Sequence, residues 1–178
     1  MNAKFLSTFL LAAGSLPLIV ASPPAAATLS GGTQITRYAG NACHPVDAQG
    51  MAQAKIDNNG RIFNTSPDHV LAVNCTVVRD QFAGKNANVT VYAIDQKQKL
   101  GALLTCRFSM DNPATGQVNS QSLFGTTEVV SSPTQAQAIK SAALSVINHA
   151  TLHCFIPQAA PDGSKQSGIA GYDFTEFQ

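Results

Sequence analysis

Tryptophan is absent from this 178-residue chain, and charged side chains make up 12% of it, about half the usual share for a soluble globular domain. Eleven basic and ten acidic residues nearly balance. Because no excess of Lys and Arg is available to neutralise phosphates, the composition excludes a basic nucleic-acid-binding protein. Hydrophobic residues reach 44% but are spread along the chain, which excludes both a disordered protein and a polytopic membrane protein.

The first 27 residues are typical of an export signal. Lys4 supplies a positive charge, residues 5–20 form an apolar stretch, and residues 25–27 are three small alanines that suit a signal peptidase. The alternative, a membrane-spanning helix, needs ~20 uninterrupted apolar residues, and Gly14 and Pro17 interrupt this shorter run. We therefore predict a signal peptide, a secreted or periplasmic location, and no membrane span after cleavage.

Removal of residues 1–27 leaves 151 residues with ten basic and ten acidic side chains, because Lys4 leaves with the signal. This length suits one domain with one core. Residues 28–40 are weakly patterned and predict an extended N-terminal arm, and residues 41–178 are expected to form the folded domain.

Four cysteines lie beyond the expected signal: Cys43, Cys75, Cys106 and Cys154. An even number of cysteines in an exported chain favours disulfides, because the compartment is oxidising. Three pairings are possible. We favour Cys43–Cys75 with Cys106–Cys154, which close loops of tens of residues and would each stabilise the fold by about 3–4 kcal/mol in the chain-entropy model.

A metal site is the alternative use of these cysteines, because His44 follows Cys43 and His153 precedes Cys154. The Cys-x₂₋₄-Cys spacing of many structural zinc sites does not occur. Adjacent residues on a strand also point to opposite faces, so both members of one Cys-His pair could not easily reach one ion. We predict disulfides, with no metal ion and no cofactor.

Three segments, 70–78, 88–94 and 100–110, alternate apolar and polar residues with the period of a half-buried strand. Residues 150–157 and 169–177 continue this pattern, with Tyr172 and Phe174 inward. On the first three segments, the side chains expected on the buried faces are Leu71, Val73, Cys75, Val77, Val89, Val91, Ala93, Ala102, Leu104, Cys106, Phe108 and Met110.

Turn-forming residues separate these segments. Asn58-Asn59-Gly60 lies between the alternating residues 52–56 and an apolar pair at 62–63, which predicts a hairpin with a type I′ turn. A polar loop is expected over 111–122, followed by one more strand over 123–130. Pro161-Asp162-Gly163 predicts another turn.

Residues 132–148 leave helix and strand open. Ser132-Pro133-Thr134-Gln135 matches a capping box with proline at the first helical position, and apolar residues then recur at helical spacing. The strand-rich segments on both sides favour a strand, because their context can override local propensity. One short helix within 133–147 is therefore one of two expectations.

A series of motifs extends from Tyr38 to Glu176: Tyr38, Cys43, Gly60-x-Ile62-x-Asn64-x-Ser66, Val73-x-Cys75, the strand 89–95, Cys106, Leu152-x-Cys154-x-Ile156-Pro157 and residues 169–172. This series resembles a group of small exported proteobacterial proteins, which are compact two-disulfide β-sandwich domains of unknown function. The resemblance implies the same two cysteine pairs and transfers no functional residue. The chain departs from the group at Thr76, where the group has proline after the second cysteine, and in the helix-like segment 132–148.

Few residues are candidates for catalysis, and we predict no catalytic residue. His69 and Asp68 are adjacent and cannot orient one another as a Ser-His-Asp triad requires, and no Gly-x-Ser-x-Gly motif occurs. The two glutamates, Glu128 and Glu176, show no spacing that supports a glycosidase pair with the eight aspartates.

Calcium binding and sugar binding are two further chemistries to consider for this sequence. Asp57-Asn58-Asn59-Gly60 offers oxygen ligands for calcium, but Arg61 and Phe63 interrupt the ligand series, so a simple hairpin turn is favoured. Sugar-binding surfaces usually stack the ligand on tryptophan, which is absent, and three tyrosines are few for that purpose.

These patterns predict an all-β protein, a single antiparallel β-sandwich stabilised by two disulfides. Its expected function is that of an exported, non-catalytic binding or structural module of the bacterial cell envelope or extracellular space. An unknown protein or glycan is expected as its partner. Two alternatives remain, a secreted hydrolase or metal-dependent enzyme with an unrecognised site, and a pilin-like subunit that donates a strand to a fibre. Two disulfides fit the pilin-like group poorly.

Overall fold

The computed structural model describes residues 32–78, 86–96, 103–112, 114–124, 135–145 and 149–177. The expected signal peptide lies outside these residues. The described helices and strands are β1 (Gln34–Ala39), the 3-10 helix η1 (Gly40–Ala42), β2 (Cys43–Pro45), α1 (Ala48–Gln53), β3 (Ala54–Ile56), β4 (Ile62–Asn64), β5 (Leu71–Cys75), β6 (Asn86–Ile94), β7 (Thr105–Asn112), β8 (Gln117–Phe124), β9 (Gln137–Lys140), β10 (Leu144–Ser145), β11 (His149–Ile156) and β12 (Gly168–Phe177).

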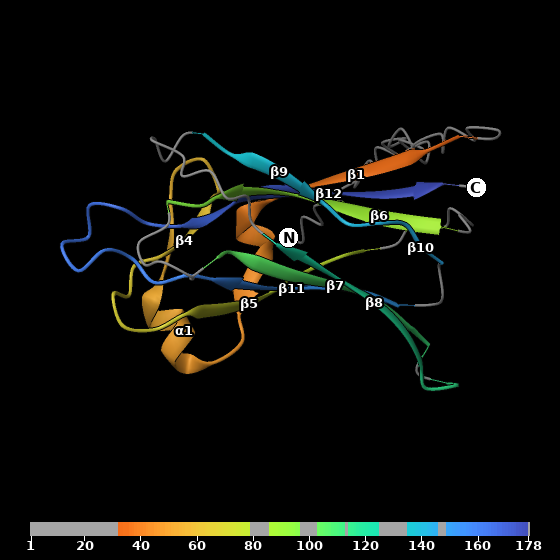
Figure 1. The fold of residues 1–178 in the computed structure, drawn as a ribbon, viewed down its shortest axis with the longest axis horizontal. Helices are drawn as coiled ribbons and strands as arrows, with labels where there is room; N and C mark the ends of the chain where they lie inside the picture. The colour runs from red at the N-terminus through yellow and green to blue at the C-terminus, as the bar shows by residue number, and fades with distance from the viewer. Residues whose placement is uncertain are drawn as a thin grey trace, which may run out of the picture.

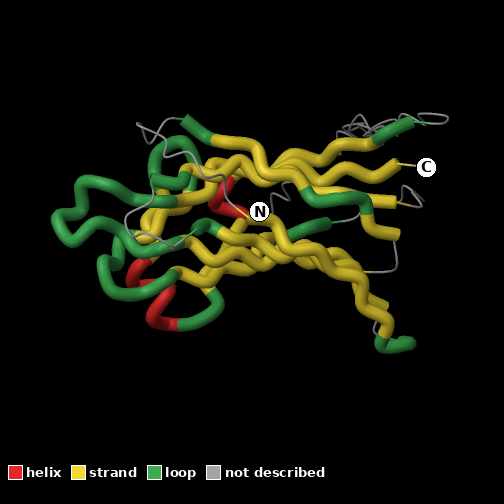
Figure 2. Tube along the Cα trace, in the orientation of Figure 1, coloured by secondary structure: helices red, strands yellow, loops and turns green. Residues whose placement is uncertain are grey.

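The strands form two antiparallel sheets that pack face to face (Figures 1 and 2). Sheet A contains β10, β6, β12, β4 and β3 in that order, with β1 added to β12 and β9 added to β6. Sheet B has the order β2-β5-β11-β7-β8. The predicted all-β sandwich is confirmed, because each sheet buries one apolar face against the other.

The core between the sheets is built from the alternating residues that the sequence places on one face of each strand. The residues expected on the buried faces of β5, β6 and β7 are buried, except that Val77 is only partly buried and Ala102 lies outside the described residues. β6 also buries Ala87, Asn88 and Ile94, so its pattern does not follow simple alternation. In β12, Tyr172 and Phe174 point inward as predicted and are 0% and 1% exposed. Phe174 meets Phe108 of the opposite sheet edge to face, with ring centroids 6.1 Å apart. This aromatic pair therefore joins the aliphatic side chains that fill the space between the layers.

Both predicted disulfides are confirmed: Cys43–Cys75 and Cys106–Cys154. Cys43 lies opposite Cys75 in the β2–β5 pair, and Cys106 lies opposite Cys154 in the β7–β11 pair. Each bond therefore joins two neighbouring strands within sheet B. All four side chains are buried on the inner face, so the sulfur atoms belong to the core.

The predicted hairpin is confirmed in β3 and β4, with a different turn. The Asp57 N–H donates to the Arg61 carbonyl, so Asn58, Asn59 and Gly60 form a three-residue loop. Gly60 carries the positive φ, 72°, as in a three-residue hairpin loop and unlike a two-residue type I′ turn.

The extended alternation expected around Ala52 is wrong, because a short helix, α1, occupies Ala48–Gln53. Asp47 initiates this helix. Its carboxylate accepts a hydrogen bond from the Gly50 N–H at 2.6 Å, which satisfies one of the backbone donors that a helix start leaves without a partner.

The polar loop expected over 111–122 is also wrong. Strand β7 continues to Asn112, and β8 begins at Gln117, so the two form a long hairpin around residues 114–116. β8 ends at Phe124, and residues 125–130 of the expected strand lie outside the described residues. Polar side chains suit β8 because most of them remain partly or fully exposed while its backbone pairs with β7.

The open choice between helix and strand in 133–147 is settled for residues 135–145, which contain β9 and β10 and no helix. Ile139 lies opposite Val91 of β6 and is buried. The next turn is fixed by Ser141, whose hydroxyl accepts from the Val89 N–H and whose own N–H donates to the Val89 carbonyl. Pairing with β6 therefore overrides the helical spacing.

The described part of the expected N-terminal arm is strand β1, which pairs with β12 of the same chain from Gln34↔Glu176 to Ala39↔Gly171. Tyr38 stacks on Tyr172 with ring centroids 4.8 Å apart. The Tyr38 hydroxyl also accepts from the Val78 N–H and donates to the Val78 carbonyl. β1 is thus an integral strand of sheet A.

Asn64, at the end of β4, connects the two sheets and is 0% exposed. Its side-chain Nδ2 donates to the carbonyls of His69, Ile156 and Pro157, at 2.8, 3.1 and 3.1 Å. Its Oδ1 accepts from the Ser66 N–H. One amide therefore satisfies backbone groups before β5 and at the end of β11, which would otherwise be costly to bury.

Replacing Cys43 and Cys75 together by alanine, or Cys106 and Cys154 together, is expected to lower the free energy of unfolding by about 4 kcal/mol in each case. The bonds close segments of 32 and 48 residues, and their loss returns entropy to the unfolded chain. Urea unfolding measures the change, with the exposed Gln117→Ala as a control expected to change it by about 0.5 kcal/mol or less. Unchanged urea midpoints in both double variants would contradict the prediction.

The variant Asn64→Leu keeps the side-chain size and is expected to lower the free energy of unfolding by about 3 kcal/mol, because buried carbonyls and the Ser66 N–H lose their partner. Asn58→Ala, in the exposed turn of the β3–β4 hairpin, is the matched control and should change stability by about 0.5 kcal/mol or less. Equal effects of the two substitutions in the same urea experiment would refute the connecting role of Asn64.

Candidate functional site: a polar groove beside the β3–β4 hairpin

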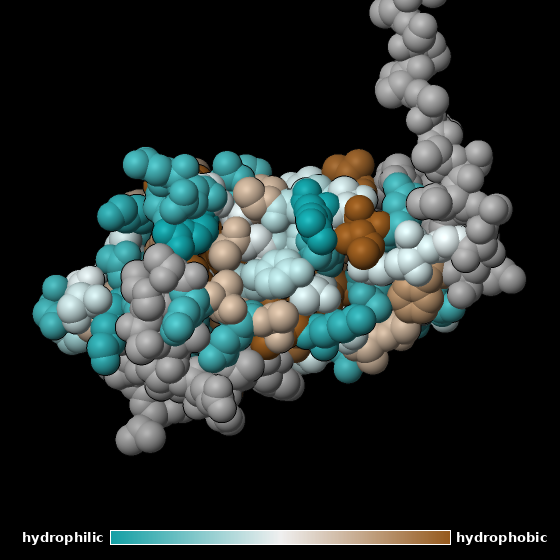
Figure 3. All heavy atoms as spheres, turned by 90° about the horizontal axis from the view of Figure 1, so that it is seen from above, coloured by the Kyte–Doolittle hydropathy of each residue, from teal (hydrophilic) through white to brown (hydrophobic). Residues whose placement is uncertain are grey.

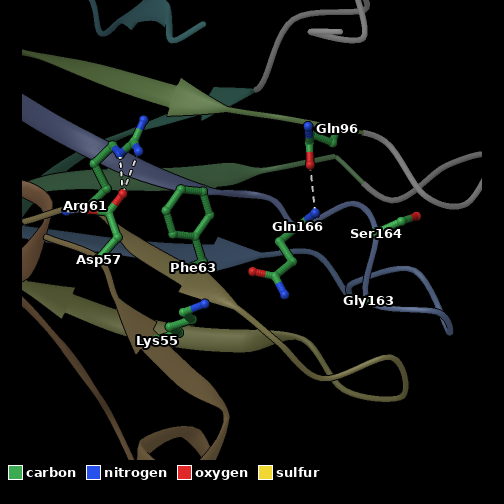
Figure 4. A pocket seen from close by; sticks show the side chains of 8 residues that line it. All are labelled: Lys55, Asp57, Arg61, Phe63, Gln96, Gly163, Ser164 and Gln166. Atoms are coloured by element: carbon green, nitrogen blue, oxygen red, sulfur yellow. Dashed lines mark hydrogen bonds and ion pairs between the residues drawn. The ribbon is translucent and has the colours of Figure 1, made fainter. Parts of the chain in front are cut away.

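A groove of about 330 Å³ lies where the β3–β4 hairpin meets the end of β6 and the loop before β12 (Figure 4). This volume is at the lower end of the range for small-molecule sites, about 300–1,000 Å³. Charged and amide side chains dominate its walls. The groove is lined by Lys55, Asp57, Arg61, Phe63, Gln96, Gly163, Ser164 and Gln166.

One wall is a fixed ion pair. The Asp57 carboxylate accepts from Arg61 Nε at 2.6 Å and lies 2.5 Å from Arg61 Nη2. It also accepts from the N–H groups of Asn59 and Arg61. The Arg61 side chain, and then these backbone donors, lower the pKa of Asp57. The arginine guanidinium lies 5.5 Å from the centre of the Phe63 ring, a cation–π contact that helps to hold it in place.

The opposite wall is held by a buried polar network. The Gln166 N–H donates to Gln96 Oε1 at 2.6 Å, and the Gln96 N–H donates to Ser167 Oγ. Ser167 Oγ in turn donates to the carboxylate of Asp95, which also accepts from the Leu104 N–H. These bonds tie the loop before β12 to the end of β6, so Gln96 and Gln166 have defined positions.

The predicted turn at 161–163 is confirmed beside this wall. The Gly163 N–H donates to the Ala160 carbonyl, and Gly163 has a φ of 69°. The Asp162 carboxylate accepts from both the N–H and the hydroxyl of Ser164, and these bonds lower the pKa of Asp162. A closed turn therefore borders the groove.

The histidines next to cysteines lie on the outer face of sheet B, away from the sulfur atoms. His44 and His153 both lie opposite Asn74, on the two strands that flank β5. His153 stacks on Phe155 with ring centroids 4.7 Å apart. The expected separation of Cys and His onto opposite faces is therefore observed, and the disulfides occupy the inner face.

His149 and His153 have a His-x₃-His spacing that favours a metal site on a helix. Both lie on strand β11, where four residues span about 13 Å. Within the described ranges, no group of three or more His, Cys, Asp or Glu side chains lies close enough to hold a metal ion.

The other residues weighed for catalysis lie apart from the groove lining. The N–H groups of Asp68 and His69 donate to Ser66 Oγ, which is ordinary turn geometry. Glu176 is buried in β12, opposite Gln34 of β1, and Glu128 lies outside the described residues. At the position weighed for calcium, the Asp57 carboxylate bonds to Arg61 and to turn amides, which confirms the simple hairpin turn.

Sheet A presents a mixed polar and neutral outer face with scattered apolar side chains (Figure 3). On this face the Tyr92 hydroxyl donates to Asp173 at 2.8 Å, and Arg37 Nε lies 3.5 Å from the same carboxylate. The bond to Asp173 raises the pKa of Tyr92. On the inner face, burial raises the pKa of Tyr172, whose hydroxyl donates to the Thr76 carbonyl.

Sequence reasoning did not identify the groove. It treated Arg61 and Phe63 as interruptions of a calcium pattern, whereas the structure places both in the groove lining. The Asp57–Arg61 spacing beside a turn was the one available signal. Nothing in the sequence relates Gln96 to Gln166, which are 70 residues apart.

No family model matches the chain, and no curated protein matches it. Among the described residues, the helices are too short to cross a membrane.

The free energy of unfolding is expected to fall as the pH rises above about 10, the ordinary tyrosine pKa. The pKa values of Tyr92 and Tyr172 are raised in the folded protein. The unfolded chain therefore releases these phenolic protons first and is favoured at high pH, while the full stabilisation is present below pH 10. Urea unfolding at a series of pH values measures this change.

The variant Asp173→Asn removes the charged carboxylate that accepts the hydrogen bond of the Tyr92 hydroxyl, so the pKa of Tyr92 should move back toward its ordinary value. Phenolate absorbance follows the titration, and Tyr92→Phe identifies which transition belongs to Tyr92. A Tyr92 transition that is the same with and without Asp173 would show that the hydrogen bond does not cause the shift.

Proposed function

We propose that this protein is an exported, non-catalytic binding or structural module that works in the periplasm or outside a bacterial cell. The observation that carries this proposal is the pair of buried disulfides between neighbouring strands. Such bonds form and persist in oxidising compartments, whereas cytosolic thiols are kept reduced. The signal peptide expected over 1–27 supports the same location.

A binding role is supported by the groove beside the β3–β4 hairpin. Its side chains come from strand ends and from a loop whose two ends are hydrogen-bonded to Asn64, through Pro157 on one side and Ser167 on the other. A site on such fixed elements can hold a ligand without first being ordered.

The eight residues that line the groove include one carboxylate, Asp57, which is already paired with Arg61. A glycosidase would need two carboxyl groups about 5–10 Å apart across a cleft. The lining therefore favours binding over the hydrolase alternative. The strand-donor alternative is disfavoured by β1, which pairs with β12 of its own chain.

Expression of the full chain in a bacterium, followed by fractionation and intact mass measurement, tests this proposal. The exported protein should lack residues 1–27, should resist alkylation before reduction, and should gain four hydrogens on reduction because two disulfides are broken. The matched control starts at Thr28 after an added methionine, stays in the cytosol and should be alkylated without reduction.

Retention of the full-length chain in the cytosol with alkylatable thiols would overturn the proposed location. Turnover in a broad panel of hydrolase substrates, lost on substitution of one described residue but kept in matched controls, would overturn the non-catalytic role.

A further inference from the structure

The groove has an excess of one positive charge. Its ionisable lining groups are Lys55, Arg61 and Asp57, and the last two neutralise each other in a double contact. Lys55 is exposed and has no ion pair or hydrogen bond within the described residues. Its ammonium group is therefore the charge that a ligand meets.

The geometry places an amide donor beside this charge. Figure 4 shows Lys55 and Gln166 extending toward the same space next to the Phe63 ring. The backbone of Gln166 is fixed by its bond to Gln96, while its side-chain amide has no partner within the described residues. An ammonium group supplies three N–H donors and an amide two more, so this space suits a ligand rich in acceptor oxygens.

The size and polarity of the site limit the ligand further. Phe63 is 6% exposed, so its ring offers little stacking surface to a ligand. A groove of about 330 Å³ suits a molecule of the size of one sugar or one amino acid. A net charge of +1 complements a monoanion such as a carboxylate better than a dianion.

From this charge, geometry and size we infer that the groove binds a small carboxylate-bearing molecule, with Lys55 and the Gln166 amide contacting the carboxylate. The inference deepens the proposed binding function and rests on it. Two sources share this chemistry, an acidic sugar and an acidic amino-acid side chain.

Matched probes test the inference on the oxidised, signal-cleaved protein by two-dimensional amide NMR. Glucuronate is compared with glucose, and N-acetylaspartate amide with N-acetylasparagine amide, so that within each pair the carboxylate replaces a neutral polar group. We expect the acidic member of at least one pair to shift the amides of residues 55–63 and 163–166, and its neutral partner to shift them at least ten-fold more weakly. The pair with the larger response identifies the source.

Two substitutions locate the charge that is responsible. Lys55→Gln should weaken binding of the acidic probe about ten-fold or more, because it removes the ammonium group of Lys55. Lys140→Gln makes the same change in net charge on β9, outside the groove lining, and should leave binding unchanged. Both lysines are exposed, so neither variant is expected to impair folding.

Several results would overturn the inference. These are no amide shifts with any probe, equal shifts from the acidic and neutral probes of a pair, shifts confined to other surfaces, or an equal loss of probe affinity in the two lysine variants. Any of these in an exported, fully oxidised protein would leave the proposed function intact and move its binding site elsewhere. A cytosolic, reduced protein would instead reject the proposed function itself.

Discussion

The Asn64 amide is the interaction on which the rest of the structure depends. The sheets pack through apolar side chains, and this amide adds hydrogen bonds to specific backbone groups of the other layer. Its backbone N–H also donates to the Ser167 carbonyl, and its side chain holds the Pro157 carbonyl. The loop between these two residues carries one wall of the groove. One buried residue therefore both connects the two layers and fixes the ends of the loop that forms this wall of the groove.

The sequence predicts this fold best where a strand has one buried face. In β5 and β7 the alternation of apolar and polar residues directly reflects burial, so the pattern identifies both the strand and its inward side. β8 has few apolar residues, and it is a strand because its backbone pairs with β7. In β9, apolar residues at helical spacing favoured a helix, but pairing with β6 buries Ile139 in a strand. Where pairing with another strand determines the secondary structure, the local sequence alone does not predict it.

The disulfides could be predicted from the sequence, whereas the groove could not. Four cysteines allow three disulfide pairings, so a pairing can be chosen from few alternatives and then tested. Groove residues have no such restriction, because lysine, arginine and glutamine are ordinary surface residues. Gln166 gains its role from a bond to Gln96 and from a loop closed by turns. The motif Gly60-x-Ile62-x-Asn64-x-Ser66 was noted from the sequence, but its meaning as a turn, a core contact and a connecting amide required the structure.

The placement of the cross-links gives the molecule a distinct response to mechanical force. Gln34 at the start of β1 lies opposite Glu176 near the end of β12, so tension on the two ends would unzip these strands one residue pair at a time, with no covalent bond to oppose it. The force would then reach Cys43 and Cys154. The segments of 32 and 48 residues that the bridges enclose could not extend. A protein stretched between two attachments would therefore extend only through residues before Cys43, between Cys75 and Cys106, and after Cys154, and would stop well short of the full length of the chain.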